Sequence, residues 1–438
     1  MDELAVKEYL AQGAMLAGAG KHEEAIAFFD KAEREKPMEI EAYISKGIAY
    51  ANLEDYEEAK SQFEKALKVN RMSGVAYYHL GNISVMQGDA ALGFEHYNRA
   101  VANGYDDAQL FYSLGLLHEE NGELDLAMRQ YSKAISKDAM RPDIRIRKAY
   151  LLKETGRILE ALRALDETIV TNPDIFEGYH LKFMILVEMQ QFDLAEELLD
   201  RAEALFPKDP GLTLNRATLH IEMQEFDEAL ALLETLENAE GTDDPMRRRI
   251  LLDRAQIYAA KGNVMSAISE LEKARALSDK YEGFDTEVMY LLCNSYLATE
   301  DYSKVLDYAR QMLENAEDGY QKESARYYVP FSLKMQGRMD EALPLYLEAI
   351  NEYRNQSLSS PGNLDACLFR VMCLRDIDQA EKALELIDYV ITLQPEMGET
   401  RLLRAAILET LGRACEAEEE AKKANTLLPA DMRGDVRS

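Results

Sequence analysis

Small residues recur every 34 positions along the first half of this chain. They are Ala25, Ala59, Gly93, Ala127, Ala161, Ala195 and Ala229. A fixed period of this length predicts an array of stacked repeats, in which each repeat contacts only its neighbours. Because such an array has no single central core, we expect function to lie on a repeated surface and not in one catalytic pocket.

Each period has the pattern of two amphipathic helices joined by a turn. In the second period, apolar and small side chains recur at three- and four-residue steps, at Tyr43, Gly47, Tyr50, Ala59, Phe63 and Ala66. A small residue at the eighth place of the period lets the partner helix approach closely. A glycine at the end of the first helix supplies a positive φ for the turn. These turn glycines are Gly20, Gly88, Gly122, Gly156, Gly262, Gly337 and Gly412.

These residues at this spacing resemble the consensus of the tetratricopeptide repeat family, with an aromatic residue in place of the usual tryptophan. The resemblance covers nearly the whole chain and implies an all-α fold, a right-handed superhelical solenoid of antiparallel helix pairs. Twelve repeats are expected, beginning near Val6, Ile40, Gly74, Ala108, Pro142, Phe176, Pro210, Arg248, Thr286, Glu323, Leu364 and Gly398.

The register becomes irregular after Ala229. Short spacers interrupt it near Asp244, Glu282 and Tyr320, and the segment from Ser357 to Asn363 is predicted to be an exposed loop. We therefore expect two arrays. Residues 1–243 would hold about seven regular repeats, and residues 244–438 about five less regular ones.

In this family, the fifth and ninth places of each first helix face a concave groove. Two sets of partner contacts are expected: the resemblance implies the first, at these places, and an apolar and aromatic cluster in the C-terminal half predicts the second. The first set is Ile44, Tyr78, Asn82, Tyr112, Leu116, Tyr150, His180 and Met184; the second is Tyr290, Tyr327, Tyr328 and Phe331. The alternative is that neighbouring first helices bury these side chains as ordinary contacts between repeats. Tyrosine hydroxyls favour the first interpretation, because they suit a surface that is apolar on one side and wet on the other.

The function implied is a non-enzymatic scaffold or adaptor that binds a peptide or helix in the groove. The alternative is a regulatory sensor that binds a signal peptide or a small ligand and relays a conformational change. No catalytic residue, cofactor or metal site is expected. The six histidines include no HExxH pair, and the four cysteines include no CxxC pair.

The charge balance restricts the expected partners. Eighty acidic residues against 50 basic ones give a formal charge of −30, which repels nucleic acid and anionic lipid, so the partner should be a neutral or basic protein or peptide. No apolar run approaches the roughly 18 residues of a membrane span, and we expect no membrane insertion and a cytoplasmic location. The first helix, with Tyr9, Leu10 and Leu16, is a candidate surface for self-association.

Overall fold

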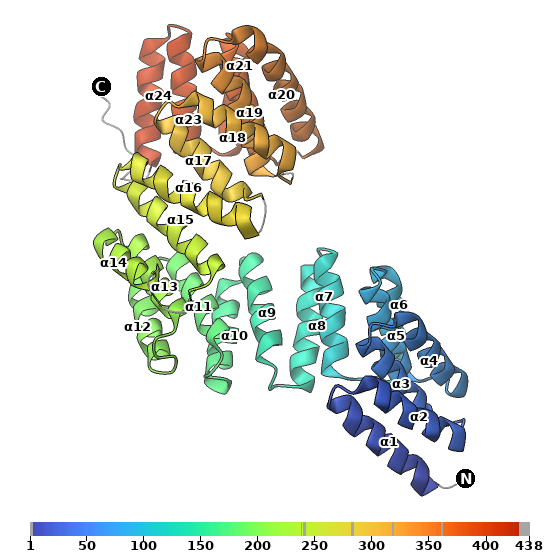
Figure 1. Cartoon of the computed structure of the whole chain (residues 1–438). Helices are drawn as coiled ribbons and strands as arrows, with labels where there is room; N and C mark the ends of the chain where they lie inside the picture. The colour runs from blue at the N-terminus through green and yellow to red at the C-terminus, as the bar shows by residue number, and fades with distance from the viewer. Residues whose placement is uncertain are drawn as a thin grey trace. The chain divides into compact units, whose positions relative to one another are not determined.

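The structure, a computed structural model, describes residues 3–237, 239, 242–281, 284–317, 319–360 and 362–428. These residues form twenty-four helices and no strand (Figure 1). The helices form consecutive pairs, so the expected all-α solenoid of helix pairs is confirmed.

The first helices of the twelve pairs are α1 (Glu3–Gly18), α3 (Ile40–Asn52), α5 (Gly74–Met86), α7 (Ala108–Glu120), α9 (Pro142–Glu154), α11 (Phe176–Glu188), α13 (Pro210–Glu222), α15 (Asp244–Ala260), α17 (Thr286–Ala298), α19 (Tyr320–Met335), α21 (Leu364–Asp376) and α23 (Gly398–Thr410). The second helices are α2 (His22–Glu35), α4 (Tyr56–Val69), α6 (Ala90–Ala102), α8 (Leu124–Lys137), α10 (Ile158–Thr171), α12 (Phe192–Glu203), α14 (Phe226–Glu237), α16 (Val264–Tyr281), α18 (Tyr302–Asn315), α20 (Met339–Ser359), α22 (Ala380–Leu393) and α24 (Ala414–Leu427).

Most first helices begin at the residue that the repeat register predicts, but α1, α15 and α19 begin one turn earlier. The expected spacers near Asp244 and Tyr320 are therefore the first turns of longer helices. Asp243 caps α15 by accepting a hydrogen bond from the backbone of Met246 at 2.9 Å. The prediction of a loop from Ser357 is also wrong in part, because α20 continues to Ser359. Glu282 lies outside the described residues.

The helices form two compact units, Met1–Asn215 and Arg216–Ser438, which are called unit 1 and unit 2 below. The boundary lies inside α13. The division of the chain after residue 243 stays a prediction.

The turn inside each helix pair contains one residue in the left-handed region. All seven predicted turn glycines have positive φ, for example +83° at Gly88. Other repeats place a larger residue in the same position, such as Glu54 with φ +61° and Gln190 with φ +56°. The repeat therefore requires the backbone conformation, and glycine is only the residue that adopts it at least cost.

The two helices of a pair pack by placing a ring of the second helix over the eighth place of the first. A Cβ atom added at Gly47 would lie 2.5 Å from Cε1 of Phe63, so this close approach requires glycine. In the sixth repeat the eighth place instead holds Phe183, and the corresponding place of the second helix holds Leu199; both are buried. A small residue at the eighth place is therefore not present in every repeat.

Candidate functional site

In unit 1, the predicted contact residues lie at three depths. Tyr78 is buried, with 7% of its surface exposed, and its ring lies 5.1 Å from that of Tyr105. Tyr150 is exposed, at 43%. The others are half-buried: Ile44, Asn82, Tyr112, Leu116, His180 and Met184.

Contacts between repeats use part of this row. Arg141, at the start of the next repeat, holds its guanidinium 5.6 Å from the centre of the Tyr112 ring. Nδ1 of His180 lies 3.0 Å from Oδ1 of Asn215 on α13. Both interpretations of the row therefore have support, and the exposed surface around Tyr150 is the part most open to a partner.

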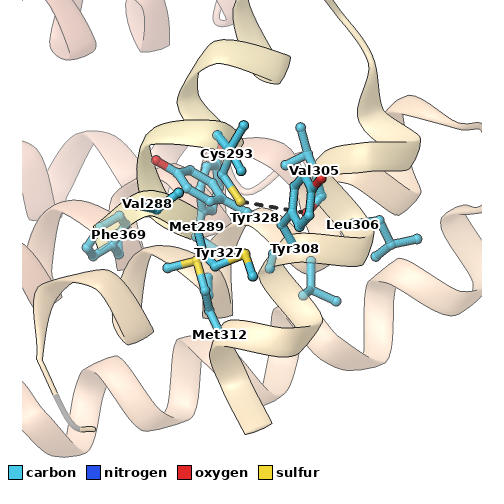
Figure 2. Packing of buried hydrophobic residues seen from close by; sticks show 14 of the residues in the cluster. Val288, Met289, Cys293, Val305, Leu306, Tyr308, Met312, Tyr327, Tyr328 and Phe369 are labelled. Atoms are coloured by element: carbon cyan, nitrogen blue, oxygen red, sulfur yellow. Dashed lines mark hydrogen bonds between the residues drawn. The ribbon is translucent and has the colours of Figure 1, made fainter. Parts of the chain in front are cut away.

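In unit 2, Tyr327 and Tyr328 belong to the interior. Figure 2 shows both among side chains of α17, α18 and α21. The hydroxyl of Tyr327 donates to Oδ2 of Asp376 at 2.9 Å, and that of Tyr328 donates to Oδ1 of Asn294 at 2.7 Å. Burial raises the pKa of the Tyr327 hydroxyl far above its usual range. Tyr290 and Phe331 are half-buried beside this cluster.

A hollow of about 560 Å³ lies against α15, α16 and α17 of unit 2. It is named here the α15–α17 hollow. Its apolar lining residues are Leu252, Ala255, Ala259, Val264, Ala267, Leu271, Leu291 and Ala298. Its polar lining residues are Arg249, Asp253, Gln256, Glu287, Asn294 and Ser295. The hollow exists because several of its lining residues are alanines, whose side chains are small. Two of the helices that line it, α15 and α17, are first helices of neighbouring repeats.

The α15–α17 hollow lies on the helix face that the repeat register assigns to the groove. Counted from Arg248 and Thr286, Leu252 occupies a fifth place, and Gln256 and Asn294 occupy ninth places. Among the fifth and ninth places of these two repeats, only Tyr290 is one of the contact residues predicted from the sequence. Counting fifth and ninth places in every repeat would also have identified Leu252, Gln256 and Asn294. The alanines that create the space belong to no sequence pattern that predicts a hollow.

Asp253 is the most deeply buried charged residue of the hollow, with 2% of its surface exposed. Its Oδ1 lies 2.8 Å from Nε of Arg249, whose side chain is half exposed. Its Oδ2 is buried and has no hydrogen-bond partner among the described residues. Burial raises the pKa of the Asp253 carboxyl. The site therefore contains an acidic oxygen whose hydrogen-bonding capacity is unused.

Two amide side chains lie at the same surface. Gln256 is exposed, and Asn294 is half-buried with its Oδ1 held by the hydroxyl of Tyr328. Because the Tyr328 hydroxyl donates to Oδ1, the amide nitrogen of Asn294 must point the other way. This nitrogen has no acceptor among the described side chains and backbone. Both amides are thus able to donate hydrogen bonds to a bound molecule.

The neighbouring arginines are paired with acids. Arg248 donates from Nε to Oδ2 of Asp285 at 2.6 Å and from Nη2 to Oε2 of Glu287 at 2.7 Å. Nη1 of Arg247 lies 3.3 Å from Oδ1 of Asp244. These arginines therefore form ion pairs within the first turn of α15 and from α15 to the start of α17.

A second hollow, of about 260 Å³, lies further along the first helices of unit 2. It is lined by Tyr320, Asp365, Leu368, Phe369, Met372, Met397, Glu399, Thr400 and Leu403. Leu368 and Met372 occupy the fifth and ninth places of their repeat. First helices of unit 2 therefore line this hollow as well as the α15–α17 hollow.

Two kinds of feature are absent from the described part of the chain. No three His, Cys, Asp or Glu side chains there are grouped so that they could hold a metal ion. None of the helices described is both long and apolar enough to cross a membrane.

Family models with the description tetratricopeptide repeat match residues 44–104, 87–143 and 186–251. Among curated proteins, the TPR repeat-containing protein YpiA of Bacillus subtilis is 26% identical over 208 residues, which cover 47% of this chain and 46% of YpiA. The mitochondrial import receptor subunit TOM70 of Rattus norvegicus is 26% identical over 159 residues, which cover 36% of this chain and 25% of TOM70. The matches thus span about half of one relative and a quarter of the other.

Among solved structures, a tetratricopeptide repeat protein from Parabacteroides merdae is similar to this chain. It is 18% identical, with a TM-score of 0.45, and the match covers 58% of this chain and 98% of that one.

Proposed function

Because the chain is a tetratricopeptide repeat protein, and repeats of this family generally mediate interactions between proteins, we propose that it is a non-enzymatic scaffold or adaptor that binds a segment of another protein along its first helices. The partner is a neutral or basic protein or peptide, since the formal charge of the chain is −30. A cytoplasmic location and self-association through α1 stay predictions.

The α15–α17 hollow is the observation that carries this proposal. An extended segment has unpaired backbone N–H and C=O groups and needs donors and acceptors beside an apolar surface. Leu252 and Leu291 supply apolar surface, while Gln256 and Asn294 supply amide groups. These are the features of a surface that binds backbone and side chains together.

In unit 1, the surface around Tyr150 is proposed to extend the binding face of that unit. Tyr112, Leu116 and Met184 are half-buried, so each keeps some surface for a partner. Aromatic side chains of this kind supply much of the energy of protein interfaces. Tyr78 is buried, so it contributes to the packing beneath these side chains and not to the exposed surface.

A selected peptide tests this proposal. Random dodecapeptides displayed on phage are selected on the full chain, and the affinity of the enriched peptides is measured by fluorescence anisotropy. Replacing both Gln256 and Asn294 by alanine should weaken binding roughly five- to 150-fold, because each of the two lost hydrogen bonds is worth about 0.5–1.5 kcal/mol. Selection that enriches no peptide, or equal affinity for the double variant, would contradict the proposed groove.

The size of the α15–α17 hollow also favours a second candidate, the regulatory sensor. Its volume of about 560 Å³ lies within the roughly 300–1,000 Å³ range of small-ligand sites. A metabolite that raises the melting temperature of the full chain by several degrees, without any peptide, would favour this function over the scaffold.

A further inference from the structure

We propose that the α15–α17 hollow is a specificity pocket for one basic side chain, lysine or arginine, of the bound segment, and that Asp253 is its acceptor. This inference rests on the proposed function and adds the chemical class of the residue recognised.

The walls of the hollow suit the aliphatic part of such a side chain. Ala255, Ala267 and Leu271 form part of an apolar lining, and Ala259 and Ala298 lie exposed among its lining residues. Lysine and arginine bury their methylene groups against apolar surface and keep the charged end on polar groups. Because the small alanines leave room for a long unbranched side chain, the shape agrees with this occupant.

A lining residue of the hollow supplies the acceptor. Asp253 is 2% exposed, and its Oδ2 has no partner among the described residues. A buried carboxylate oxygen without a donor is costly, because it has lost its hydrogen bonds to water and gained none from the protein. Arg249 pairs only with Oδ1 and is half exposed, so it leaves this cost in place. A donor from a bound molecule would remove it.

The charges around the hollow favour a cationic donor. Glu287 also lines it, but its carboxylate is paired with Nη2 of Arg248 at 2.7 Å, so the carboxylate with unused hydrogen-bonding capacity is that of Asp253. An acidic side chain would be repelled by Asp253, and a neutral amide would satisfy the hydrogen bond without supplying the opposite charge. A lysine ammonium or an arginine guanidinium does both.

The experiment uses the peptides selected on the full chain, and compares the wild type with Asp253→Asn. We expect a lysine or arginine at one fixed place in the enriched peptides. Replacing that residue by norleucine, which keeps the aliphatic chain and removes the charge, should weaken binding to the wild type at least tenfold. Asp253→Asn should weaken binding of the basic peptide by a similar factor and leave the norleucine peptide unchanged.

Two further variants control for folding and location. Asp307→Asn makes the same chemical change at an exposed residue of α18 and should leave affinity unchanged. Ala298→Trp fills the hollow from an exposed residue of its lining and should abolish binding of the basic peptide, while circular dichroism shows an unchanged helix content.

The outcomes separate this inference from the proposed function. Enriched peptides without a fixed basic residue, or a basic peptide that binds Asp253→Asn as tightly as the wild type, would overturn the basic pocket and leave peptide binding in place. Selection that enriches no peptide would overturn the proposed function, and the pocket with it.

Discussion

His79 shows how the repeat places one polar ring in an apolar environment. Its imidazole stacks on the ring of Phe63 in the preceding repeat, with 5.1 Å between the ring centres, and lies 5.0 Å from the ring of Tyr78. Burial lowers the pKa of His79 from 6.5 to about 4. The folded chain therefore holds this side chain neutral over a pH range in which the unfolded chain protonates it.

We expect a pH-dependent loss of stability from this residue. A base whose pKa is lower in the folded state contributes stability above its unfolded pKa of 6.5, and the contribution is lost as the pH falls through 4. The free energy of unfolding, measured by urea denaturation, should fall by on the order of 2 kcal/mol more in the wild type than in His79→Phe between pH 7 and pH 4. Parallel pH curves for the two proteins would contradict this.

At the scale of helices, a pair is held together by complementary sizes across its interface. The ring of Phe63 on α4 lies over Gly47 on α3, while the fifth repeat uses Ala149 and Leu165 at the same two places. The pairing tolerates either combination because the summed volume is similar. The extra residues that break the 34-residue period lengthen α15, α19 and α20 at one end of each helix. The helices remain paired as in the regular repeats.

This packing predicts a coupled pair of substitutions. Gly47→Ala should destabilise the chain by about 1–3 kcal/mol, because its Cβ would lie 2.5 Å from the Phe63 ring. Adding Phe63→Leu recreates the combination of the fifth repeat, so the double variant should be about 1 kcal/mol more stable than the sum of the two single effects. Urea denaturation followed by circular dichroism measures this, and strictly additive effects would contradict it.

At the scale of the whole molecule, contacts run mainly between helices that are neighbours in the chain. A local defect should therefore spread only to adjacent repeats. Asp376 on α21 is suited to test this in unit 2. Its carboxylate accepts from Tyr327 of α19 at 2.9 Å and from Tyr346 of α20 at 3.1 Å, and lies 3.4 Å from Nζ of Lys334.

Asp376→Ala should leave the buried hydroxyls of Tyr327 and Tyr346 without their acceptor and destabilise α19, α20 and α21. Hydrogen exchange should become at least tenfold faster in these helices and stay unchanged in α5 to α8 of unit 1. Asp376→Asn, which keeps an acceptor for the hydroxyls, should have a smaller effect in the same helices. Equal acceleration along the whole chain would show that the array unfolds as one unit.

Sequence alone determined the repeat, the helix pairs, the positive φ of their turns and most helix starts. These features follow from residues close together in the chain, such as Gly88 in its turn or Gly47 sixteen positions before Phe63, so local sterics decide them. It also identified the inner places of the first helices, from which three lining residues of the α15–α17 hollow, Leu252, Gln256 and Asn294, could have been counted.

Only the tertiary structure decided which of those places are open. Tyr78, Tyr150 and Tyr327 share a residue type and lie on first helices, yet Tyr78 and Tyr327 are buried and Tyr150 is exposed. No sequence motif predicts that Oδ2 of Asp253 is buried without a hydrogen-bond partner among the described residues. Exposure at each place depends on the summed size of side chains from two adjacent repeats, and that sum is set by packing across the array and not by the period of the sequence.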